Sequence, residues 1–173
     1  MAVRRLKRTA PPSADVGRPL TLLKRARDTA AHAYAPYSGF SVGAAVETTD
    51  GQVFAAANME NASYGLTLCA EAGALQAASS AGALAKIRRI AVVGGPIKPG
   101  HDLRPTATPP CGRCRQLIAE AAQAGGRDIE VWFGDLEGKV VQAKTISELL
   151  PDAFGPRNLA PGPAPELALR KRA

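Results

Sequence analysis

Residues 87–133 read IRRIAVVGGPIKPGHDLRPTATPPCGRCRQLIAEAAQAGGRDIEVWF and decide the fold. The apolar run at 87–93 predicts a strand, the stretch at 112–123 predicts a helix, and 129–133 predicts a second strand. Two strands of one sheet that are joined through a helix run parallel to each other. The stretch 96–110 contains five prolines and no hydrophobic period, so it is expected to be a loop.

Two segments that precede this stretch also have clear patterns. A helix is expected over about 20–34, because apolar side chains recur at helical spacing on one face: Leu20, Leu23, Ala26, Ala30 and Ala33. The pair Asp50-Gly51 suits a tight turn and lies between two runs of small and Val residues within 41–58. These two runs are expected to form an antiparallel hairpin.

The remaining pattern completes one sheet with helices. We expect a helix at 69–80, a strand at 139–143 and a short helix at 146–150. Helices that alternate with strands pack on both faces of a sheet. The crossover makes one strand pair parallel and the hairpin makes another antiparallel. The sequence therefore predicts an α/β protein, a three-layer α/β/α sandwich with a mixed five-stranded sheet.

The net charge of +7 is concentrated at the two ends of the chain. Residues 1–27 carry eight Lys or Arg and one Asp, and 156–173 carry four and one Glu. Residues 28–155 carry ten basic and thirteen acidic side chains, which is a net charge of −3. A folded nucleic-acid binder usually shows its basic surface within the domain, so solvated arms are favoured over contact with nucleic acid. We predict three parts: a basic, disordered N-terminal arm at 1–18, one folded domain at 19–155, and a flexible basic tail at 156–173.

Location and redox state follow from what the sequence lacks. No apolar stretch is long enough to span a bilayer, and the basic start is not followed by the apolar run of a secretory signal. We therefore expect a cytoplasmic protein. Three cysteines are an odd number, and in a cytoplasmic chain they favour metal binding or catalysis over a disulfide framework.

The three cysteines lie at two predicted helix starts. Cys111 and Cys114 are three residues apart at a helix start, a spacing that suits one metal ion and a redox dithiol equally well. Cys69 opens another predicted helix, and the positive end of a helix dipole stabilises a thiolate. The third thiol favours a metal site.

Three thiol ligands leave the fourth position of a zinc ion open to water, as in a catalytic site. Neither His32, in the first helix, nor His101, in the loop, is expected to be a ligand. A zinc-activated water needs a proton carrier, and Glu71 follows Cys69 by two residues. A Glu that stands alone in the first turn of a helix is more often a partner of the helix dipole, so this role for Glu71 depends on the whole set of residues. Cys-x-Glu combined with Pro-Cys-x-x-Cys, which begins at Pro110, is the pattern of zinc deaminases.

Five separated blocks quoted from 20–155 carry a wider resemblance. They read APYSGFSVGAA at 35–45, NMENASYG at 58–65, CAE at 69–71, PCGRCRQ at 110–116 and ELLPDAF at 148–154. In these blocks the chain resembles the cytidine deaminase family, in its small three-cysteine form.

The resemblance implies an enzyme, a homotetramer with active sites at subunit interfaces and one Zn²⁺ per chain held by Cys69, Cys111 and Cys114. It implies hydrolytic deamination of cytidine and deoxycytidine to uridine and deoxyuridine, with Glu71 moving the protons. It also assigns substrate contacts: Asn58 and Glu60 to the ribose hydroxyls, Phe40 to the base, the Ala70 backbone to the pyrimidine edge, and Ala62, Tyr64 and Phe154 to a neighbouring subunit's site. The chemistry of Glu60 agrees, because its charge would repel a phosphate and so favours a free nucleoside.

One position departs from the family pattern, which commonly has Arg directly after the Glu where this chain has Ala72. Three thiolates and Zn²⁺ sum to −1, and we expect Arg113, Arg115 or the helix N-termini to offset that charge. The loop at 96–110 is longer than usual in the family. Three alternatives stay open: a deaminase of another aminopyrimidine nucleoside, a nucleic-acid editor or binder, and a non-catalytic thiol or zinc module.

Overall fold

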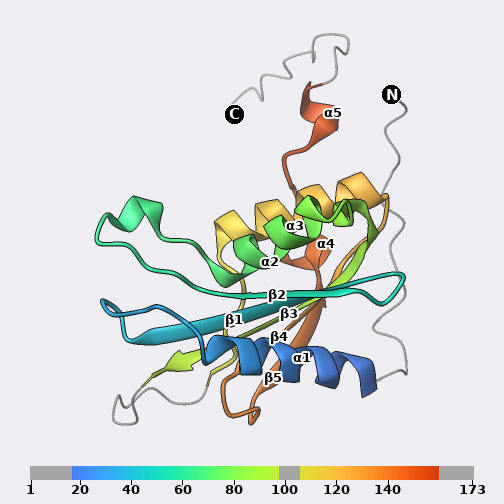
Figure 1. Ribbon diagram of the computed structural model, residues 1–173. Helices are drawn as coiled ribbons and strands as arrows, with labels where there is room; N and C mark the ends of the chain where they lie inside the picture. The colour runs from blue at the N-terminus through green and yellow to red at the C-terminus, as the bar shows by residue number, and fades with distance from the viewer. Residues whose placement is uncertain (1–16, 98–105, 160–173) are drawn as a thin grey trace, which may run out of the picture.

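The computed structural model describes residues 17–97 and 106–159 and forms three layers (Figure 1). A five-stranded sheet lies in the middle, with α1 on one face and α2, α3 and α4 on the other. In chain order the elements are α1 (Gly17–Ala30), β1 (Phe40–Thr48), β2 (Val53–Ala57), η1 (Tyr64–Leu66), α2 (Ala70–Ser80), η2 (Leu84–Lys86), β3 (Ile87–Pro96), α3 (Gly112–Gly125), β4 (Glu130–Asp135), β5 (Val141–Thr145), α4 (Ile146–Leu149) and α5 (Pro156–Leu159).

The sheet is mixed, with the strand order β2-β1-β3-β4-β5. Strand β1 pairs antiparallel with β2 and β3, β3 pairs parallel with β4, and β4 pairs antiparallel with β5. Helix α3 connects the parallel pair, as the crossover argument predicted. The predicted α/β sandwich and its mixed five-stranded sheet are confirmed.

Helix α1 buries most of the predicted face, and Leu20 is the exception. Its buried side chains are Leu22, Leu23, Ala26 and Ala30, whereas Leu20 is 52% exposed. The helix packs closest at Gly43 of β1, where an added Cβ would lie 2.0 Å from the carbonyl oxygen of Ala26. At 100° per residue Leu20 lies about 120° around the helix from Ala26, so it faces solvent. The helix also ends at Ala30, before the predicted Tyr34.

The core consists of two apolar layers built largely from small residues. Between α1 and the sheet lie Leu22, Leu23, Ala26, Ala30, Ala45, Ala91 and Val93. The larger layer, under α2, α3 and α4, includes Val46, Ile90, Val92, Ile118, Ile129 and Val131. On that side Gly73 of α2 lies against β2, because an added Cβ would be 2.8 Å from the Cβ of Ala56. Both faces of the sheet therefore carry helices at very short range.

Several strand boundaries differ from the prediction. Strand β5 begins at Val141, two residues later than expected, because the turn after β4 continues to Val140. The backbone N–H of Val140 donates to Oδ1 of Asp135 at 2.9 Å and closes that turn. Strand β3 extends past Val93 to Pro96.

The predicted divisions of the chain stay predictions. The expected arm at 1–18 lies mostly outside the described residues, as do most of the tail and His101 of the loop at 96–110. Helix α5 forms at the start of the stretch predicted to be the tail. Across 17–97 and 106–159 we find no helix of the length and apolarity needed to cross a bilayer.

Candidate active site

The three cysteines meet at the N-termini of two helices. Cys69 is the N-cap of α2, Cys111 is the N-cap of α3, and Cys114 lies in the first turn of α3. Their sulfur atoms all lie within 4.8 Å of one another, and none of the three forms a disulfide. Thiolates on one tetrahedral zinc lie about 3.8 Å apart, because each Zn–S bond is about 2.3 Å. The three donors therefore fit one zinc ion with a small contraction.

The electrostatics of this cluster also suit a divalent cation. Burial raises the pKa of Cys114 far above its ordinary value, and the charges of Glu71, Cys69 and Cys111 raise it further. Burial likewise raises the pKa of Cys69, while the positive charge of Arg113 acts in the opposite direction. Thiols that are held together in this way ionise when a cation lies among them. The donor set thus fits Zn²⁺ in its chemistry as well as its spacing.

Glu71 is buried beside the thiols, in the first turn of α2. Burial raises the pKa of its carboxyl group, and hydrogen bonds from its own backbone N–H and from Cys114 partly oppose that rise. A carboxyl group with a raised pKa exchanges protons more readily near neutral pH than an exposed one. The environment of Glu71 is therefore suited to proton transfer, and it is no surface dipole partner.

Asn58 is held rigidly at the end of β2. Its Oδ1 accepts from the backbone N–H of Val42 at 2.8 Å, and its Nδ2 donates to the carbonyl of Phe40 at 3.0 Å. One N–H of the amide remains after these two bonds, and its direction is fixed by them. The ring of Phe40 lies against Gly94, where an added Cβ would be 2.9 Å from Cε1. The hydrogen bond from Asn58 to the Phe40 carbonyl thus fixes the two residues relative to each other.

Glu60 supports the turn that precedes Phe40. Its Oε2 accepts from the backbone N–H groups of Tyr37 and Ser38 at 2.9 and 3.2 Å. The Ser38 hydroxyl, followed by these two N–H groups, lowers the pKa of Glu60. The carboxylate is therefore ionised at neutral pH, and its second oxygen can accept a hydroxyl.

Backbone hydrogen bonds join the segment that carries Asn58 and Glu60 to the segment that carries Cys69. Met59, between Asn58 and Glu60, exchanges two hydrogen bonds with Leu68, at 3.0 and 2.9 Å. Leu68 directly precedes Cys69, so the bridge brings the end of β2 beside the N-terminus of α2. The structure thus brings together the three cysteines, Glu71, Asn58, Glu60 and Phe40, which are spread over 75 residues of sequence.

Comparison with known proteins identifies the group to which this site belongs. Residues 18–125 match the family described as the cytidine and deoxycytidylate deaminase zinc-binding region. The chain belongs to the cytidine and deoxycytidylate deaminase family. That match spans the sequence from α1 to the end of α3 and includes all three cysteines.

Individual members of this deaminase family cover nearly the same region. The chain is 47% identical to a cytidine deaminase of Halalkalibacterium halodurans over 133 residues, which are 77% of this chain and 91% of that protein. It is 42% identical to a cytidine deaminase of Mycobacterium tuberculosis over 130 residues, 75% of this chain and 84% of that one. The crystal structure of cytidine deaminase from Burkholderia pseudomallei has 43% identity and a TM-score of 0.66, covering 78% of this chain and 98% of that chain.

Three of the residues expected to contact the substrate are exposed on the surface of the single chain. Ala62 is exposed, and the exposed fractions of Tyr64 and Phe154 are 75% and 57%. Tyr64 lies in η1, where its ring is 6.1 Å from that of Tyr37. Ala70, whose backbone is expected to contact the pyrimidine edge, is fully buried beside Glu71 in the single chain. The assignments of all four stay predictions.

The sequence did not reveal the hydrogen bonds that polar side chains of α3 donate to backbone carbonyls. Arg115 donates to two backbone carbonyls, those of Pro110 and Leu149, and Gln116 donates to that of Phe154. The run Cys-Arg-Gln at 114–116 was part of the family resemblance, but carbonyl acceptors leave no trace in a sequence. The guanidinium of Arg115 is therefore hydrogen-bonded to backbone carbonyls. Burial and the charges of Glu71 and Cys111 raise the pKa of Cys69, and the positive charge of Arg113 lowers it.

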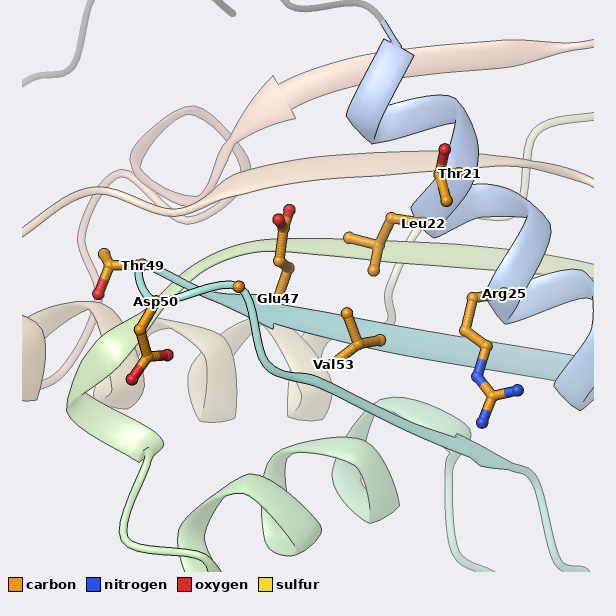
Figure 2. Close-up of a pocket in the computed structure, with 8 residues that line it drawn as sticks. Thr21, Leu22, Arg25, Glu47, Thr49, Asp50 and Val53 are labelled. Carbon is orange, nitrogen blue, oxygen red and sulfur yellow. The ribbon is translucent and has the colours of Figure 1, made fainter.

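A hollow of about 780 Å³ lies at the other end of β1, on the α1 face of the sheet (Figure 2). Leu22 and Arg25 of α1 line one side, and Glu47 and Asp50 line the other. The two carboxylates already have partners, since Glu47 pairs with Arg88 at 2.9 Å and Asp50 pairs with Lys86 at 3.0 Å. No cysteine or histidine is among its described lining residues, so this hollow lacks the donors for deaminase chemistry.

Proposed function

We propose that this chain catalyses the hydrolytic deamination of cytidine and deoxycytidine to uridine and deoxyuridine, with release of ammonia. The observation that carries the proposal is the meeting of three thiols with a buried glutamate at two helix N-termini. The relatives described above carry the name cytidine deaminase at up to 47% identity. A cytoplasmic role in pyrimidine salvage follows from this activity as part of the same proposal.

The metal site in this proposal consists of Cys69, Cys111 and Cys114. Zinc bound there would lower the pKa of a water molecule and so supply a nucleophile at neutral pH. Glu71 accepts a proton from the attacking water and delivers it to N3 of the ring. A second proton passes through Glu71 to the amino group at C4, which leaves as ammonia while the C4 carbonyl of uridine forms. One water is consumed for each ammonia released.

The substrate in this proposal is a free nucleoside. Asn58 donates its remaining N–H to a ribose hydroxyl, and Glu60 accepts a hydrogen bond from one. Because the lowered pKa of Glu60 keeps it ionised, a phosphate group placed there would be repelled. This argument favours nucleosides over the deoxycytidylate that the family description also mentions. The ring of Phe40 provides an apolar face for the base.

The assembly in this proposal is a homotetramer in which Ala62, Tyr64 and Phe154 complete a neighbour's site. Exposed apolar side chains support this idea. They occur in the segment before β1 and in the segment between β2 and α2: Tyr34, Tyr37, Met59, Tyr64, Leu66 and Leu68. Exposed apolar surface of this kind marks interfaces. Light scattering on the purified protein should give about four times the chain mass of 17.9 kDa.

The deciding experiment measures the loss of ultraviolet absorbance when purified protein is added to cytidine, with zinc per chain from elemental analysis. We expect conversion to uridine and one zinc per chain. Deoxycytidine should react as well, whereas cytidine 5′-monophosphate should not. Bound zinc without conversion of either nucleoside would reject the proposal and direct the search to other aminopyrimidines. A disulfide between Cys111 and Cys114 in place of zinc would indicate a redox module.

A further inference from the structure

Helix α3 contacts both the turn that precedes it and a segment distant in sequence through one side chain. Nε of Arg115 donates to the carbonyl of Pro110 at 2.8 Å, and Nη1 donates to the carbonyl of Leu149 at 3.1 Å. Pro110 directly precedes Cys111, and Leu149 is the last residue of α4. A single guanidinium thus bridges the turn that carries a metal ligand and the segment that continues to Phe154.

The same helix holds the far end of that segment. Nε2 of Gln116 donates to the carbonyl of Phe154 at 2.8 Å, and Nε2 of Gln123 lies 3.4 Å from the same oxygen. An added Cβ on Gly155 would be 2.0 Å from Oε1 of Gln123, so α3 and the segment are in close contact. The backbone of Phe154 is therefore anchored while its side chain is exposed.

Arginine suits this bridge because of its shape. Its planar guanidinium presents several N–H donors in fixed directions, whereas a lysine offers one compact group on a flexible chain. Arg115 is half buried, and its guanidinium satisfies two backbone carbonyls at once. Arg113 rather than Arg115 is the cation that acts on Cys69, which separates the geometric contribution of Arg115 from a charge effect.

We propose that Arg115 is a positioning residue that fixes the Pro110–Cys111 turn of the metal centre and the Phe154 segment relative to each other. The second half of this statement rests on the proposed function, in which Phe154 completes a neighbouring site. The first half concerns zinc alone and is independent of the substrate. Arg115 therefore couples retention of the metal to binding of the nucleoside.

The test compares Arg115→Ala and Arg115→Lys with Arg127→Ala in the full chain. Arg127 is a matched control, because Nη1 of this arginine also donates to a carbonyl, that of Ala85, at the opposite end of α3. Zinc release to an excess of chelator should be about tenfold faster in both Arg115 variants and unchanged in Arg127→Ala. The KM for cytidine should rise by about tenfold in the same two variants, with a smaller change in kcat.

Gln116→Ala separates the two ends of the bridge. Removal of its bond to the Phe154 carbonyl should raise the KM and leave the rate of zinc release at the wild-type value. If Gln116→Ala released zinc as fast as the Arg115 variants, the Phe154 segment itself would hold the metal turn, and the role given to Arg115 would be wrong.

Two further results would overturn the proposal. Zinc release at the wild-type rate in Arg115→Lys would show that charge alone suffices, and equal acceleration in Arg127→Ala would show a general loss of stability. If Arg115→Ala does not fold, Arg115→Lys and Gln116→Ala still decide the question. Should the wild-type protein fail to turn over cytidine, the zinc measurement tests the metal half of the proposal separately.

Discussion

The metal centre and the rim around it, which contains Tyr64 and Phe154, differ in whether one chain is enough to form them. Cys69, Cys114 and Glu71 are partly or fully buried and lie together within one chain. Tyr64 and Phe154, on the rim, expose 75% and 57% of their surfaces. This difference indicates that the fold of one chain arranges the reactive groups, whereas the proposed substrate site is completed by neighbouring subunits. Mutations in the two regions should therefore fail in different ways.

The largest effect is expected from Cys114→Ala, in the metal centre. Cys114 is fully buried, and its removal leaves two thiols that cannot hold zinc tightly. Turnover of cytidine should fall to background, and elemental analysis should find well under one zinc per chain. Full occupancy with zinc in this variant would mean that another side chain completes the site.

Glu71→Gln should separate metal binding from proton transfer. The amide keeps the size of the side chain but cannot carry the proton, so kcat should fall by about 10²- to 10⁴-fold. Zinc content and oligomeric mass should match the wild type, because Glu71 is no ligand in this mechanism. Retained turnover would remove Glu71 from the proton path.

Phe154→Ala tests the rim directly. Loss of an aromatic contact to the substrate should raise the KM by about tenfold while zinc content stays at one per chain. Mixing this variant with Glu71→Gln chains during reassembly should restore part of the activity at low substrate concentration, since some sites then combine an intact Glu71 with an intact neighbouring Phe154. No recovery in the mixed tetramers would place Phe154 outside the neighbour's site.

Ala72→Arg should have a small effect on the metal centre. Arg113 and the N-termini of α2 and α3 already oppose the negative charge of the thiolates, so kcat is expected to change by less than about threefold. Steady-state kinetics with cytidine measures this change. A rise of tenfold or more would show that the cation missing at this position limits the wild-type enzyme.

Glu47→Gln, at the opposite end of β1, should leave the chemistry unchanged. Its carboxylate is buried and pairs with Arg88 at 2.9 Å and Arg89 at 3.5 Å. Loss of the charge should lower the free energy of unfolding by about 3 kcal/mol, measured by urea denaturation, with kcat and KM at wild-type values. An altered KM would connect the two ends of the sheet.

The sequence was most informative where chemistry depends on local spacing. Cys111 and Cys114 had to lie on one face of a helix start, and Cys69 had to open another helix, so their meeting could be predicted. The parallel crossover and the hairpin at Asp50-Gly51 followed from short-range rules and are confirmed.

Features that depend on packing could not be predicted from the sequence. The buried face of α1 is set by its contact with Gly43, which a helical pattern alone cannot reveal, and Leu20 was wrongly assigned to it. The start of β5 depends on a hydrogen bond to Asp135. The bridge by Arg115 joins carbonyls, which every residue has, so no residue type marked its partners.

The short approach of helices at Gly43 and Gly73 has a consequence for changing which substrates the protein accepts. Where α1 meets β1 at Gly43, and where α2 meets β2 at Gly73, there is no room for one added methyl group. Directed evolution toward bulkier nucleosides is therefore not expected to act by moving these two helices relative to the sheet. Adaptive substitutions should accumulate instead in the exposed segment 62–66 and around Phe154, where side chains can change without disturbing the layers below.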